Sequence, residues 1–116
     1  MPAAALTTPN VQERRFAARR QPTMGTVCYL ASHSGDNLGM GLVWNLSSTG
    51  ISMLLHRGLE SGTTVLAQLA TMNADFTLPL TLRVAHVALM RTGDFILGGQ
   101  FSRELTETEM GNFVGQ

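Results

Sequence analysis

The sequence predicts an all-β domain, a small antiparallel barrel of about six strands that ends in a short α-helix. Three observations carry this prediction. Apolar residues alternate with a period of two in most segments after Met24, and short turns rich in Gly, Asn and Ser separate those segments. The third observation is a change of period in the last dozen or so residues, where the pattern becomes helical. A length of 116 residues suits one domain with a small core.

The first half of the barrel is expected to hold three strands. Residues 26–30 form an apolar strand candidate, which the turn-forming segment 33–37 closes. Large apolar residues alternate with smaller ones through 40–46, and the alternation resumes at 51–55. The polar segment 45–50 therefore predicts a turn that joins these two strands.

The second half shows the clearest alternation in the chain. A strand at 65–69 precedes a long one that begins at Phe76, in which the apolar parity changes near Ala85-His86. A change of parity within one strand predicts a bulge or bend at that point. Pro79 falls on the polar parity, as expected of an edge or strand-start position, because proline cannot donate a ladder hydrogen bond.

A hairpin turn and a helix complete the fold. Residues 91–94 form the turn, and they lead into a last strand at 95–101. Thr106 and Glu109 have the spacing of a capping box, which predicts a helix that begins at Glu107. The apolar residues expected on one side of that helix, where they would cover an end of the barrel, are Leu105, Met110, Phe113 and Val114.

The organisation along the chain follows from composition. Residues 1–13 are rich in Ala, Thr and Pro and are expected to form a disordered leader. One domain is expected over 14–116. It comprises an arginine-rich switch arm at 14–23, a barrel at 24–103 and a helical segment at 104–116.

Charge is distributed unevenly between these parts. All eight basic residues are arginine, half of them lie between Arg14 and Arg20, and the formal net charge is zero. This asymmetry predicts an anion-binding arm on a body that binds neither DNA nor RNA. No apolar run is long enough for a signal peptide or a membrane span, so we expect a cytoplasmic protein without membrane insertion.

Two motifs carry the chemistry. Arg15-x-x-x-Arg19 places two planar guanidinium groups close together, and each can bind a phosphate or a guanine edge in bidentate fashion. Asn45-x-Ser47-x-x-Gly50 places an amide, a hydroxyl and backbone donors on a tight bend. Together the two motifs predict a site for a planar, anionic, guanine-like ligand.

With these motifs in this order, the chain resembles the PilZ domain family of cyclic di-GMP receptors. Leu59-x-x-Gly62-x-x-Val65 and Gly98-x-x-Phe101 are similar to two later landmarks of that family. The resemblance runs from about Glu13 to the C-terminus. It implies a six-stranded antiparallel barrel of the split-barrel type, a C-terminal helix, and an arm at the mouth of the barrel that folds over the ligand.

The resemblance also implies roles for individual residues. Asn45, where many relatives have aspartate, would address a guanine edge or the sugar, and Ser47 would donate to a base or phosphate. Gly50 would adopt a positive backbone angle or allow close approach of the ligand. Arg14, just before the motif, implies two nucleotides per chain. The candidate cyclic di-GMP-binding residues are Arg14, Arg15, Arg19, Asn45, Ser47 and Gly50, with Arg20 and Gly99 as further candidates.

The expected function is therefore that of a receptor: cyclic di-GMP orders the arm and the signal passes to an unidentified effector protein. We expect no enzymatic activity, no cofactor and no metal, because no nucleophile, base and acid are arranged together and the histidines lack ligand spacing. Two alternatives stay open. One is a nucleotide-independent PilZ-like adaptor, and the other is a barrel that binds single-stranded nucleic acid, which the scattered arginines disfavour.

Three further expectations concern packing and assembly. Cys28 lies in an apolar run, which predicts a buried, unreactive thiol. Trp44 is expected to pack on or near the barrel, with a place at the rim of the site as the alternative. The apolar run Met53–Leu55 leaves room for an exposed patch, and the chain is expected to be a monomer or a weak homodimer.

Overall fold

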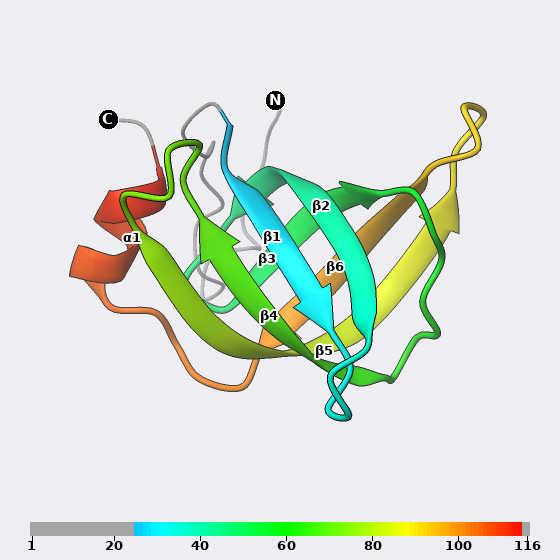
Figure 1. Cartoon of the computed structure of the whole chain (residues 1–116), viewed down its shortest axis with the longest axis horizontal. Helices are drawn as coiled ribbons and strands as arrows, with labels where there is room; N and C mark the ends of the chain where they lie inside the picture. The colour runs from blue at the N-terminus through cyan, green and yellow to red at the C-terminus, as the bar shows by residue number, and fades with distance from the viewer. Residues whose placement is uncertain (1–24, 115–116) are drawn as a thin grey trace, which may run out of the picture.

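The computed structural model describes residues 25–114, which form a closed antiparallel barrel with a helix at one end (Figure 1). The elements are β1 (Val27–Ala31), β2 (Asn37–Leu46), β3 (Gly50–Leu55), β4 (Thr64–Ala70), β5 (Thr77–Leu89), β6 (Phe95–Phe101) and α1 (Glu107–Phe113). The six predicted strands and the C-terminal helix are thus confirmed, with strand limits that differ by a few residues.

The strands neighbour one another around the barrel in the order β1-β2-β3-β6-β5-β4, and β4 returns to β1. Four of the six neighbouring pairs join strands that follow each other along the chain. The other two pairs, β3 with β6 and β4 with β1, join distant segments and close the barrel. Closure satisfies the backbone groups along the strands without leaving a long open edge.

The barrel interior is a single apolar core. Inward residues of every strand contribute to it, and Ile51, Met53, Leu69 and Leu82 are fully buried. Helix α1 closes one end of the barrel, because Met110 and the other three predicted apolar residues belong to the same core. This confirms the predicted capping role of the helix.

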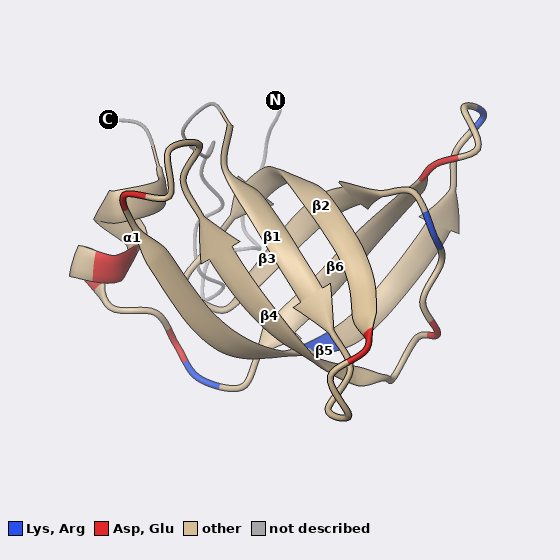
Figure 2. Ribbon diagram, viewed as in Figure 1, with Lys and Arg blue, Asp and Glu red and all other residues tan. Residues whose placement is uncertain are grey.

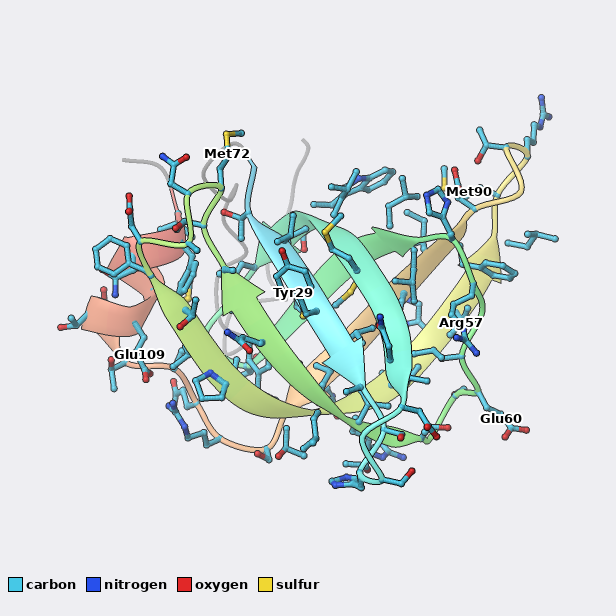
Figure 3. The ribbon with its side chains drawn as sticks, viewed as in Figure 1. Tyr29, Arg57, Glu60, Met72, Met90 and Glu109 are labelled. Atoms are coloured by element: carbon cyan, nitrogen blue, oxygen red, sulfur yellow. The ribbon has the colours of Figure 1, made fainter. Side chains whose placement is uncertain are left out.

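The N-terminal end of α1 has the predicted capping box. The Thr106 hydroxyl accepts the Glu109 N–H at 3.1 Å, and the Glu109 carboxylate accepts the Thr106 N–H at 2.9 Å. Arg103 then donates to the same carboxylate through both terminal nitrogens, at 2.9 and 2.8 Å. Glu109 therefore links the start of the helix to the segment that follows β6 (Figure 3).

Both irregularities predicted for β5 are present. The register with β6 shifts between Val84 and His86, as expected of a bulge at Ala85. Pro79 pairs only with β4, at Gln68, because β6 begins to pair with β5 further along, at Leu82. The proline thus lies where its other side has no strand partner.

The prediction that an exposed apolar patch lies at Met53–Leu55 is wrong in its location. Met53 and Leu55 are fully buried, and only Leu54 faces outward. The large apolar residues of β2 lie outside instead, among them Trp44, because Gly41 faces inward beneath Met53. A Cβ at Gly41 would come within 2.9 Å of the Met53 Cγ, so the interior has no room for a larger residue there.

Among residues 25–114, the charged residues lie mainly in turns and at the helix (Figure 2). Among the six strands, only β5 carries a charged residue, Arg83. The walls of the barrel are therefore almost without charge.

Candidate functional site

The predicted turn lies between β2 and β3, and the side chain of Ser47 organises it. Its hydroxyl accepts the backbone N–H groups of Gly50 at 3.1 Å and Thr49 at 3.3 Å, and the Ser47 N–H donates to the Gly50 carbonyl at 2.9 Å. Ser47 is almost completely buried. Much of its hydrogen-bonding capacity is thus used inside the turn, where it fixes the backbone conformation.

The segment after β6 holds the turn from outside. The Thr49 carbonyl accepts the Phe101 N–H at 2.9 Å, and the Ser48 carbonyl accepts the Leu105 N–H at 2.7 Å. Both donors are backbone groups at or just beyond the end of β6, so this part of the chain supports the turn. Hydrogen bonds with Ser47 within the turn and from the end of β6 thus fix the same backbone segment.

Gly50 has a packing role that the sequence did not indicate. Its φ does not lie in the left-handed region, so the predicted positive backbone angle is wrong. Instead, a Cβ at Gly50 would stand 2.6 Å from the backbone carbonyl oxygen of Gly99 on β6. The structure thus shows a close approach of β6 at this position, and the expected approach of a ligand stays a prediction.

Gly99 has a packing role in the structure. Its Cβ position faces the core, 2.7 Å from the Leu82 Cδ1, while its carbonyl lies against Gly50. Both glycines let β3 and β6 approach each other closely beside the turn.

Asn45 begins a polar row that crosses four strands. Register pairs Asn45 of β2 with Ser52 of β3, Ser52 with Gly98 of β6, and Gly98 with His86 of β5. Ser52 alternates with the buried residues of β3, so the row lies on the outer face of the barrel. Neighbouring strands are about 4.8 Å apart, and the row therefore spans roughly 15 Å.

Gly98, in the middle of this row, has no side chain, and this leaves the room that the His86 ring occupies. The exposed His86 ring lies over it, with Nε2 and Nδ1 at 2.7 and 2.9 Å from where a Cβ would stand. The edge of the imidazole that carries both ring nitrogens thus lies against Gly98, and the ring is part of the outer surface of the sheet.

A second row lies next to the first. Gly50 pairs with Gln100 of β6, which pairs with Arg83 of β5, and both side chains are exposed. The outer face beside the turn therefore combines a carboxamide from Gln100 with the guanidinium of Arg83. We call the outward residues Asn45, Ser52, Gly98, His86, Arg83 and Gln100 the polar platform.

The sequence analysis did not identify four of the platform residues: Ser52, His86, Arg83 and Gln100. Alternation placed Arg83 on an outward parity, but nothing local indicates that β5 and β6 lie beside the 45–50 turn. The predicted arm residues Arg14, Arg15, Arg19 and Arg20 lie outside the described residues.

Other reactive groups lie elsewhere. Cys28 is buried as predicted, and its burial raises the pKa of the thiol to about 12, although a hydrogen bond with the backbone of Gln68 opposes this. His56 contacts the Asp94 carboxylate at 2.8 Å, and this hydrogen bond lowers the pKa of Asp94.

Within residues 25–114, no cluster of three or more His, Cys, Asp or Glu side chains is placed to hold a metal ion. Over the same residues, no helix has the length and apolar character needed to cross a membrane.

No family model matches the sequence, and no curated protein matches it. Solved structures do match the fold. Escherichia coli YcgR in complex with cyclic di-GMP superimposes with a TM-score of 0.65 and 18% identity, over 88% of this chain and 43% of that one. The PilZ domain of E. coli YcgR with cyclic di-GMP gives a TM-score of 0.63 at 14% identity, over 87% of this chain and 86% of the domain.

The chain has the PilZ fold. A complex of MrkH from K. pneumonia with cyclic di-GMP supports this, with a TM-score of 0.63 and 18% identity over 80% of this chain. The present chain spans less than half of the YcgR and MrkH chains, 43% and 45% respectively. The predicted resemblance is thus confirmed for the fold. The 45–50 turn and the polar platform lie on the outside of a PilZ barrel.

Proposed function

We propose that this domain is a receptor without enzymatic activity that binds cyclic di-GMP on the polar platform, beneath the arginine arm. Proteins with cyclic di-GMP in their solved structures share the fold. The observation that carries the proposal for this chain is that its candidate groups converge: the turn of the second motif, an amide, an imidazole and a guanidinium lie on adjacent strands.

The entry point of the chain supports a role for the arm. The Thr26 carbonyl accepts the Val43 N–H at 3.2 Å, so the described chain begins beside the end of β2 that leads to Asn45. Arg19 precedes Gly25 by only six residues, and six residues span at most about 20 Å. Since the described chain begins this close to the platform, the segment before it is short enough to bring Arg15 and Arg19 within reach of a ligand bound there.

The ligand's chemistry matches these groups. Each guanine presents O6 and N7, which accept a bidentate contact from an arginine, and each phosphodiester carries a negative charge. Asn45 both donates and accepts, so it suits the mixed edge of a guanine, and Arg83 suits a phosphate. Charge-assisted hydrogen bonds contribute about 1.5–3 kcal/mol each. Two of them supply a large share of the roughly 8 kcal/mol that micromolar binding needs.

Signalling follows from the ordering of the arm. In this proposal residues 14–23 close over the nucleotide, and the new surface binds an effector protein. Amide hydrogen exchange with and without cyclic di-GMP tests this, since exchange in 14–23 should slow on binding. Unchanged exchange there, with nucleotide bound, would remove the relay but leave the binding site.

Titration calorimetry with cyclic di-GMP, cyclic di-AMP and GTP is the main test. Arg15→Ala and Arg19→Ala should each weaken cyclic di-GMP binding by about tenfold or more, a loss of about 1.4 kcal/mol. Arg91→Ala is the matched control, because Arg91 is exposed on the β5–β6 turn and carries the same charge. Heat with none of the nucleotides would favour the adaptor function instead.

Three further variants separate the parts of the site. His86→Ala and Arg83→Ala should also weaken binding, whereas unchanged affinity in both would move the ligand away from β5. Arg14→Ala should reduce the stoichiometry from two nucleotides per chain toward one, and an unchanged ratio would contradict the second ligand.

A further inference from the structure

A second surface feature lies on the outer faces of β1, β2 and β4. Five large apolar side chains there are between 40% and 50% exposed. They are Tyr29, Met40, Leu42, Trp44 and Leu66. We call these five residues the apolar face. Scattered exposed apolar residues need no explanation, but a contiguous group of this size is unusual on a monomer.

Register shows that the group is contiguous. Tyr29 of β1 lies directly opposite Met40 of β2, and Leu42 follows Met40 on the same side of β2. Leu66 of β4 lies opposite Ala31, two residues beyond Tyr29. Figure 3 shows Tyr29 on β1 between β2 and β4, in the middle of this surface.

The apolar face carries no charge. Strands β1, β2 and β4, and the adjoining β3, contain no Asp, Glu, Arg or His, and the chain has no lysine. Figure 2 shows the same strands without coloured residues. Depletion of charge together with exposed Trp, Tyr and Met is the composition of the centre of a protein–protein interface.

The apolar face has both a ridge and a groove. Met40, Leu42 and Trp44 stand along β2 and form the ridge. Beside it is a groove of about 520 Å³, whose lining includes Tyr29, Leu66 and residues of β4 and β5 such as Gln68 and Pro79. One surface thus contains a protruding element and an adjacent depression.

We propose that the apolar face binds the apolar face of a second copy of this chain, with the β2 ridge of each copy entering the groove of the other. A two-fold dimer requires one surface to complement itself, and a ridge beside a groove meets that requirement. Like charges cannot oppose each other across an uncharged surface, and two copies of zero net charge do not repel at long range. A different partner would more often be selected through opposite charge, which this surface does not offer.

The area sets the expected strength. The five side chains expose on the order of 400 Å² in total, taking roughly 200 Å² as the full area of one large side chain. A standard interface buries about 800 Å² per partner, so the group supplies about half, and the rim of the contact must supply the rest. We therefore expect a dimer that forms in the micromolar range.

Sedimentation velocity of the full chain without nucleotide, over a micromolar concentration series, is the test. The mass should rise from 12.5 kDa toward twice that value. Trp44 is the only tryptophan in the chain, so its fluorescence should shift to longer wavelength on dilution as the indole returns to water. A monomer at all concentrations, or a dimer whose dilution leaves the tryptophan emission unchanged, would overturn the proposal.

Variants locate the contact. Leu42→Glu and Trp44→Glu should each weaken the dimer by about tenfold or more, since each places a charge in the buried centre. Leu89→Glu is the matched control: Leu89 is more exposed than either residue but lies at the end of β5, outside the apolar face, and its variant should dimerise like the wild type. Circular dichroism checks that each variant is folded. A dimer that survives in folded Leu42→Glu, or one that Leu89→Glu disrupts instead, would place the contact elsewhere. Because nucleotide is absent, neither result bears on the cyclic di-GMP site.

Discussion

Replacing Gly50 with alanine should destabilise the barrel through a backbone contact. The new Cβ would stand 2.6 Å from the Gly99 carbonyl oxygen, whereas ordinary van der Waals contact begins at 3.4 Å. The atom in the way belongs to the backbone of β6, which cannot rotate aside as a side chain does. Strands β3 and β6 must therefore separate locally, next to the 45–50 turn.

The magnitude follows from two opposing effects. Overpacking of this kind costs about 1–3 kcal/mol. Alanine also restricts the unfolded chain relative to glycine, which returns about 0.4–1 kcal/mol. The net loss is about 1–2 kcal/mol, and it should lower the Tm by about 5–15 °C in a domain of this size.

Thermal denaturation followed by circular dichroism measures this, and Gly111→Ala is the matched control. Gly111 lies in α1 with nothing within 4 Å of its Cβ position and without a positive φ. The same substitution there should stabilise by about 0.5–1 kcal/mol, because glycine disfavours helix. The two variants should thus shift the Tm in opposite directions. A Gly50→Ala protein at least as stable as wild type would refute the close-approach argument.

Three more predictions concern other parts of the structure. Ser47→Ala leaves the Thr49 and Gly50 N–H groups without their acceptor and should cost about 1–3 kcal/mol in urea denaturation. Thr49→Ala is the comparison: it removes only the 3.3 Å contact between the Thr49 and Ser47 hydroxyls at an exposed residue, and should stay within about 0.5 kcal/mol. Hydrogen bonds from Arg103, and then from the Thr106 N–H, lower the pKa of Glu109 from 4.5 to about 2. The ionised Glu109 therefore stabilises the folded state fully above pH 4.5, and this stabilisation is lost as the pH falls toward 2. Glu109→Gln should accordingly flatten the fall of Tm between pH 4.5 and 2. High salt should reduce the difference in Tm between variant and wild type, since the Arg103–Glu109 pair is exposed. Equal dependence of Tm on pH in the two proteins would contradict the stabilising role of Glu109. Cys28, with its pKa raised to about 12, should resist iodoacetamide at pH 8 until the protein is denatured, and rapid labelling of the native chain would show that the thiol is accessible.

Much of the local structure was predictable because it depends on neighbouring residues. Alternation indicated each strand, and the change of parity located the bulge at Ala85. The Thr106–Glu109 spacing predicted where α1 begins. In each case the interaction that fixes the structure joins residues only a few positions apart.

The composition of the polar platform was not predictable in the same way. His86 and Arg83 come close to Asn45 only because β3 pairs with β6, a pairing between residues 40 to 50 positions apart. A period of two shows which residues share a face, but not which strands are neighbours. The contact between Gly50 and the carbonyl of Gly99 was not predictable for the same reason.

The sequence by itself determined the strands, their turns, the capped helix and the motifs that resemble a nucleotide receptor, because short-range periodicity and turn chemistry encode them. Only the tertiary structure decided which side of β2 faces the core. The buried Met53 fills the space above Gly41, so Leu42 and Trp44 remain in solvent and create the apolar face. That outcome depends on how much volume the opposite strands already occupy, and alternation along one strand carries no record of it.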